Sequence, residues 1–73
     1  MIHVEIYDFR SRITWTSSHR SNTSQEAINR AVRKCFGRSA RFERVDGAHG
    51  KVRISHRNGG AYLISDRVRI RVV

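Results

Sequence analysis

One segment of helical periodicity, between residues 23 and 37, constrains the fold more than any other feature of this sequence. Thr23-Ser24-Gln25-Glu26 matches a capping box, in which the Thr23 hydroxyl caps the N3 amide and Glu26 reaches back. An apolar stripe follows at helical spacing, and Gly37 is suited to end the helix. The stripe consists of Ala27, Ile28, Ala31, Val32 and Cys35. The sequence therefore predicts one helix, from about Ser24 to Phe36.

The residues before this helix alternate between apolar and polar, which is the periodicity of a half-buried strand. Ile2, Val4 and Ile6 point to one side of the first strand. A turn is expected over Asp8 to Ser11, and a second strand over about Arg12 to Ser17. We expect an antiparallel hairpin with about four residues in its bend.

Four further strands are expected after the helix, separated by turn-forming residues. The expected strands are Arg38 to Val45, Lys51 to His56, Ala61 to Ser65 and Arg67 to Val73. The turns are marked by Asp46-Gly47, by Asn58-Gly59-Gly60 and by Asp66. The order is then ββαββββ, and residues 1–73 form a single small basic α+β domain. We expect an antiparallel sheet packed against a single α-helix, with the other face of the sheet open.

The size of the chain and its few reactive side chains limit the chemistry it can perform. A chain of 73 residues and 8.5 kDa has room for one small core and little surface for a deep pocket. Because Cys35 is the single cysteine, an internal disulfide is excluded. Cys35 lies on the apolar stripe of the helix, so we expect it to be a buried structural thiol. The histidines form no local metal-binding or catalytic pattern. They are His3, His19, His49 and His56. We therefore expect no metal, no cofactor and no enzymatic activity.

The charge of the chain indicates the class of partner. Fifteen basic residues, 13 of them arginine, against six acidic residues give a formal net charge of +9. Such an excess favours nucleic acid, or a protein that handles nucleic acid, as the partner. Solubility and the codon usage of a GC-rich genome are the alternative explanations. No aromatic amphipathic helix and no signal peptide are expected, which disfavours a membrane surface and favours the cytoplasm.

The candidate binding residues form two basic groups. Arg67, Arg69 and Arg71 alternate along the last strand, so that their guanidinium groups share one face and can hold phosphates. The same pattern also suits a solvated edge strand, on which positive charge prevents aggregation. Lys51 and Arg53 join this group if their strand presents them on the same open face. The second group lies on the exposed face of the helix, where cations also favour the helix dipole. It consists of Arg30, Arg33 and Lys34.

The few aromatic residues divide between the core and the open face. Trp15 and Phe42 alternate with polar residues and are expected in the core. Tyr7 and Tyr62 are candidates for the open face, and Tyr62 is the better candidate for stacking on bases. Phe9 follows the first strand and either extends it or belongs to the turn. No aromatic-basic motif for reading a nucleic-acid sequence is present.

Several motifs between Ser24 and Tyr62 occur together in this chain. They are Ser24-Gln25, Cys35-Phe36, the strand and turn Arg41-Phe42-Glu43-Arg44-Val45-Asp46-Gly47, and Asn58-Gly59 before Tyr62. In these motifs the chain resembles a family of small phage-encoded anti-CRISPR proteins that act on type I-F surveillance complexes. The resemblance implies a non-enzymatic protein with an antiparallel sheet and one helix. It also implies binding to the backbone subunits that hold the guide RNA.

Binding of that kind blocks the pairing of target DNA with the guide, and basic residues additionally attract duplex DNA. No contact residue is transferred from the family, because its basic helix positions do not align with those of this chain. The leading prediction is an anti-CRISPR-type inhibitor that docks on a CRISPR–Cas nucleoprotein complex in the bacterial cytoplasm. The alternative is a small non-specific nucleic-acid-binding or regulatory protein. A homodimer is compatible with both.

Overall fold

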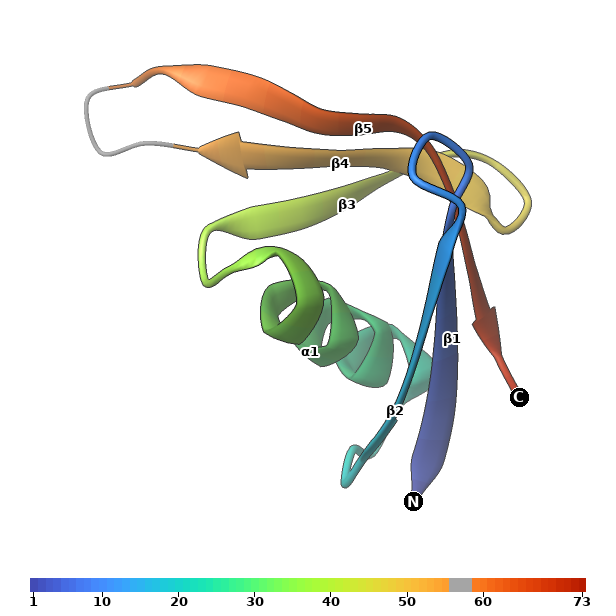
Figure 1. Ribbon diagram of the computed structural model, residues 1–73. Helices are drawn as coiled ribbons and strands as arrows, with labels where there is room; N and C mark the ends of the chain where they lie inside the picture. The colour runs from blue at the N-terminus through green and yellow to red at the C-terminus, as the bar shows by residue number, and fades with distance from the viewer. Residues whose placement is uncertain (56–58) are drawn as a thin grey trace.

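The computed structural model describes residues 1–55 and 59–73, which form one helix and five strands (Figure 1). The elements are β1 (Ile2–Asp8), β2 (Ile13–His19), α1 (Ser24–Phe36), β3 (Ala40–Asp46), β4 (His49–Ser55) and β5 (Ala61–Val72). The strands form one antiparallel sheet in the order β2-β1-β5-β4-β3. The expected α+β class, an antiparallel sheet with a single helix, is confirmed. Of the residues named above, His56 and Asn58 lie outside the described part of the chain.

The sheet bends strongly around α1, and β5 belongs to both sides of the bend (Figure 1). The first part of β5 pairs with β4, where Ala61 lies opposite Ser55. The second part pairs with β1, where Val72 lies opposite Val4. The helix occupies the concave side of this bent sheet. We call the opposite, convex side the outer face.

The C-terminal part of the chain differs from the prediction in its number of strands. The expected bend at Asp66 does not end a strand, because β5 continues from Ala61 to Val72. The observed order is therefore ββαβββ, with five strands in place of the expected six. The chain changes direction through two irregularities in the pairing of β4 with β5. Each irregularity accommodates one extra residue in β5, which bends a strand without breaking its ladder.

The helix begins and ends where the sequence predicted. The Thr23 hydroxyl accepts a hydrogen bond from the amide of Glu26 at 3.1 Å, as an N-cap does. The reciprocal half of the predicted capping box is not formed, because the Glu26 carboxylate pairs with Arg30 at 2.8 Å instead of reaching back to Thr23. At the other end Gly37 has a φ of 112°, a value that a side chain disfavours, and its amide bonds to the carbonyl of Arg33. Local signals at both ends thus define α1.

The core lies between α1 and the concave side of the sheet. The helix contributes Ala27, Ile28, Ala31 and Val32, which are all buried. The sheet contributes Val4, Ile6, Ala40, Val52, Val68 and Ile70. Cys35 is half-buried against this cluster rather than fully buried. Within the described residues, no helix has the length and apolar composition needed to cross a membrane.

Candidate nucleic-acid interface

The three arginines of β5 lie on the outer face of the sheet. Val68 and Ile70, which alternate with them, are buried in the core on the concave side. Successive side chains of a strand point to opposite faces, so Arg67, Arg69 and Arg71 point outward. The predicted placement of this group on one open face is therefore confirmed. Whether these residues contact a partner stays a prediction.

One carboxylate lies among these arginines. Arg71 donates to Oε1 of Glu5 from Nη2 at 2.7 Å and from Nε at 3.2 Å. Arg69 lies 3.8 Å from the same oxygen. Glu5 faces Arg71 directly across the β1–β5 ladder, which explains the contact. A single carboxylate offsets one of three positive charges, so the row remains positive. Ion pairs this exposed contribute about 1 kcal/mol or less and weaken in salt.

Two aromatic rings lie directly beside the arginine row. The guanidinium carbon of Arg67 is 4.7 Å from the centre of the Phe9 ring, and that of Arg69 is 5.5 Å from the centre of the Tyr7 ring. The two rings meet edge to face at 4.7 Å. The imidazole of His49 stacks on Phe9 at 5.7 Å and 26°. We call Tyr7, Phe9, His49, Arg67 and Arg69 the outer-face cluster. It combines cations with flat apolar surfaces, as cation–π contacts require.

The aromatic predictions are confirmed only in part. Trp15 and Phe42 are half-buried and pack against the core, as expected. Tyr7 lies on the outer face, also as expected, because it alternates with buried Ile6 and Asp8. The side chain of Tyr62 lies outside the described part of the chain. Sequence reasoning did not select Phe9. Its position two residues after Tyr7, which continues the period of the strand, was the available signal.

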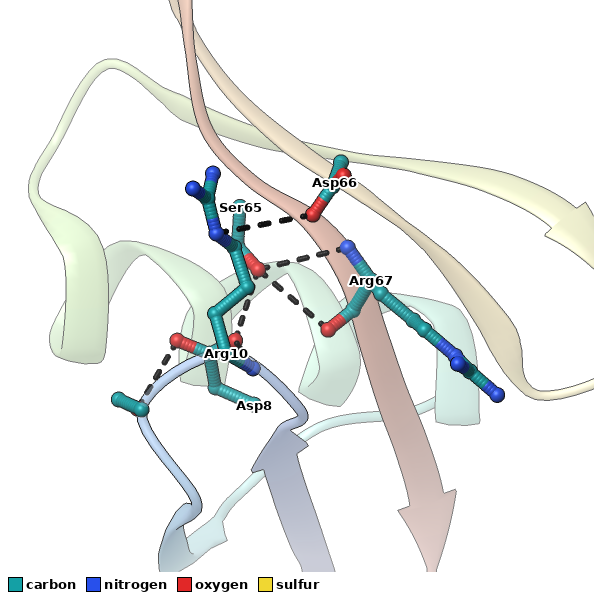
Figure 2. Close-up of polar contacts among 6 residues, drawn as sticks. Asp8, Arg10, Ser65, Asp66 and Arg67 are labelled. Atoms are coloured by element: carbon teal, nitrogen blue, oxygen red, sulfur yellow. Dashed lines mark hydrogen bonds and ion pairs between the residues drawn. The ribbon is translucent and has the colours of Figure 1, made fainter.

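A network of hydrogen bonds, buried between Ser65 and Asp8 and partly buried elsewhere, holds the chain at this cluster (Figure 2). Asp8, at the end of β1, accepts hydrogen bonds from the Ser65 hydroxyl at 2.8 Å and from the Arg10 amide and the Ser11 hydroxyl at 3.0 Å. Burial raises the pKa of Asp8, but these hydrogen bonds together outweigh it and hold the pKa below its ordinary value. The amide of Phe9 then bonds to the carbonyl of Arg67 at 3.1 Å. The network therefore fixes the backbone from which Phe9 and Arg67 project.

Lys51 and Arg53 lie on the outer face with the arginine row. They flank Val52, which is buried on the concave side, so both point outward. Arg53 pairs with Glu43 of β3 at 3.2 Å, and Lys51 lies opposite the same glutamate in the ladder. The sequence analysis grouped Lys51 and Arg53 with the arginines of β5 only if they share the open face, and the structure shows that they do. Five of the predicted binding residues are thus on one surface: Lys51, Arg53, Arg67, Arg69 and Arg71.

The basic group of the helix is not part of this surface, because α1 covers the concave side of the sheet (Figure 1). Arg30 is held by Glu26 and by the carbonyl of Arg20, to which it donates at 2.7 Å. Arg33 and Lys34 are exposed, and Arg33 borders a small groove between α1 and β3. The structure therefore separates the two predicted groups, which cannot contact one short segment of nucleic acid together.

The remaining reactive groups of the described residues include Cys35 and two serine–histidine pairs of the first hairpin. Ser17 Oγ lies 2.7 Å from Nε2 of His19, and Ser18 Oγ lies 2.6 Å from Nδ1 of His3. Burial raises the pKa of Cys35, and the nearby charge of Lys34 only partly opposes this effect. A raised pKa disfavours the thiolate, which is the nucleophilic form. Burial and the charges of Lys34 and Arg30 lower the pKa of His19. The described residues contain no group of three or more metal-ligating side chains.

Comparison with known proteins identifies no relative from which a function could be assigned to this chain. No protein-family model, no curated protein and no solved structure matches the chain. The geometry of the outer face and the chemistry of its residues are therefore the basis for the function proposed below.

Proposed function

We propose that this protein is a non-enzymatic binding protein that holds nucleic acid, free or within a nucleoprotein complex, on the outer face of its sheet. One observation carries the proposal. Lys51, Arg53, Arg67, Arg69 and Arg71 gather on a single face with the carboxylates of Glu5 and Glu43 among them. The face therefore keeps a positive charge on a rigid support.

Phosphate groups are the partner chemistry that suits this face best. An arginine can give two parallel hydrogen bonds to a phosphate, and the alternating positions of a strand space such contacts regularly. Release of counterions from the nucleic acid then supplies much of the binding free energy. Contacts of this kind carry no sequence information, so we expect binding that depends on salt and little on sequence.

A more specific form of the proposal makes the partner a CRISPR–Cas surveillance complex. The resemblance to type I-F anti-CRISPR proteins supports it, and so does the presence here of an antiparallel sheet with one helix, which that resemblance implies. In this form the protein acts in the bacterial cytoplasm and blocks binding of target DNA. A purified type I-F complex and labelled target duplex provide the test. Unchanged target binding at saturating protein would contradict this form and leave the broader proposal standing.

Two matched variants test the broader proposal. Lys51→Gln/Arg67→Gln/Arg69→Gln removes three charges from the outer face, and Arg33→Gln/Lys34→Gln/Arg38→Gln removes three from the helix side. Arg71 is retained because it holds Glu5. Fluorescence anisotropy with labelled oligonucleotides, at two salt concentrations, measures the affinity.

We expect the outer-face variant to bind at least tenfold more weakly, a loss of about 1.4 kcal/mol, with a shallower salt dependence. The helix-side variant carries the same net charge and is expected to bind much more tightly than the outer-face variant. A larger loss in the helix-side variant would move the interface to that face. Wild-type affinity in both variants would show that the charge serves only solubility.

A further inference from the structure

We infer that the outer-face cluster selects single-stranded over duplex nucleic acid, because unpaired bases stack on it. This inference deepens the proposed function and rests on it. The arginine row alone would accept any phosphate chain. The aromatic rings beside it add a contact that only an exposed base can make.

The two rings of the cluster lie outside the core. Tyr7 and Phe9 are half-buried on the outer face, on the opposite side of the sheet from α1. Their aromatic and cationic neighbours are each other, His49, Arg67 and Arg69. The core is filled without them, by residues of α1 and of the concave side of the sheet. Packing of the hydrophobic core therefore does not explain aromatic residues at these two positions.

The arrangement of the cluster matches what a base requires. His49 and Phe9 stack with nearly parallel planes, 26° apart, although His49 begins β4 and Phe9 directly follows β1. Arg67 lies over Phe9 at 4.7 Å and is exposed. Bases stack on aromatic rings and on the planes of arginine guanidinium groups alike. The cluster thus offers flat surfaces next to cations that hold the adjoining phosphates.

The same geometry disfavours a duplex. In a duplex the faces of the bases are covered by their neighbours, and only phosphates and groove edges reach a convex protein surface. A single strand exposes its base faces and follows an extended sheet. Stacking tolerates any base because every base has a π-face, so DNA and RNA single strands are both suitable.

The experiment compares four labelled probes of one length: oligo(dT), oligo(U), a mixed-sequence duplex and an abasic oligodeoxynucleotide. The abasic probe has the phosphates of the single strand without its bases. We expect wild-type protein to bind oligo(dT) and oligo(U) at least tenfold more tightly than the abasic probe and the duplex. Phe9→Leu and Tyr7→Leu keep the charge and are each expected to lose about fivefold or more on the base-bearing single strands only.

Two further variants make the test specific. Ile13→Ala removes an exposed apolar side chain of β2 that points away from the outer face, and we expect it to bind all probes as wild type does. Arg67→Lys keeps the charge but lacks the guanidinium plane, so it is expected to weaken binding to oligo(dT) and oligo(U) by a larger factor than binding to the abasic probe and the duplex. This variant provides the decisive comparison if thermal denaturation shows that Phe9→Leu is unfolded.

The outcomes separate this inference from the proposed function. Equal affinity of wild-type protein for the abasic probe and oligo(dT) would overturn the stacking inference and leave phosphate binding intact. Tighter binding of the duplex than of either single strand would also overturn it. Binding to none of the probes would instead contradict the proposed function itself.

Discussion

The hydroxyl of Ser65 donates a 2.8 Å hydrogen bond to the carboxylate of Asp8, 57 positions away in the sequence. Both side chains are buried, one at the end of β1 and one in the bent part of β5. The contact joins the end of β1 to the part of β5 in which the pairing with β4 is irregular (Figure 2). It also adjoins Phe9 and Arg67, so the outer-face cluster depends on it for its position.

Ser65→Ala is expected to destabilise the domain in a manner that depends on pH. Loss of a buried hydrogen bond to a charged group costs about 1.5–3 kcal/mol at neutral pH. The pKa of Asp8 in the folded protein lies below its ordinary value of 3.8. The ionised carboxylate therefore stabilises the folded state fully at pH values above 3.8, and this stabilisation is lost as the pH falls through the lowered pKa. Denaturant unfolding at pH 7 and at pH 2.5 measures the difference between wild type and variant. The difference should shrink at the lower pH.

Ser39→Ala is the matched control for this prediction, because Ser39 is exposed in the loop between α1 and β3. It should change the free energy of unfolding by about 0.5 kcal/mol or less. A cost of Ser65→Ala that is equally small at neutral pH, or that does not vary with pH, would contradict the role assigned to Asp8.

Gly50→Ala is expected to destabilise the domain severely. A Cβ at this position would lie 2.7 Å from two carbons of the Phe42 ring and would also clash with the backbone carbonyl of Glu43. The carbonyl cannot move without disturbing the β3–β4 ladder. Overpacking of this kind costs about 1–3 kcal/mol, and about 1 kcal/mol lowers the Tm of a small domain by about 4–8 °C. Calorimetry should show the decrease. In the control Gly60→Ala the new Cβ meets no atom within 4 Å, so a similar decrease there would refute the steric explanation.

Arg12→Gly is expected to stabilise the protein. Arg12 lies in the turn between β1 and β2 with a φ of 61°, a left-handed conformation that costs a side-chain-bearing residue about 1–2 kcal/mol. Glycine adopts this left-handed conformation without strain but loses more conformational entropy on folding. We therefore expect the free energy of unfolding to rise by about 0.5–1 kcal/mol, which a higher Tm would show. Arg10→Gly removes the same charge from the same turn at a residue with negative φ, together with an exposed 3.9 Å ion pair to Asp66 that contributes about 1 kcal/mol or less. An equal gain in that control would attribute the effect to charge.

Cys35 is expected to react slowly in the folded protein and to be dispensable for binding. Its half-burial and raised pKa both reduce attack by the thiolate. Alkylation by iodoacetamide at pH 8 should be much slower in native buffer than in denaturant. Cys35→Ala should retain wild-type affinity for oligonucleotides. If a folded Cys35→Ala protein lost all biological activity, the non-enzymatic interpretation would fail.

Local signals in the sequence determined the helix, most of the strands and the class of fold. The cap at Thr23 and the stop at Gly37 predicted the observed bounds of α1, because helix ends depend on hydrogen bonds between residues a few positions apart. Alternation likewise placed Arg67, Arg69 and Arg71 on one face, since the period of a strand is local.

Only the tertiary structure decided how distant segments pair. Asp66 is a residue typical of turns, and the sequence therefore predicted a bend there. In the structure β5 continues through Asp66 as one strand, with two bulges nearby and the Asp8–Ser65 hydrogen bond beside it. The same pairing brings Phe9 beside Arg67 and His49, which are distant in sequence. Register and bulges arise from contacts between strands rather than within them. A local period therefore predicts on which side of its strand a residue lies, and the folded sheet decides which residues become its neighbours.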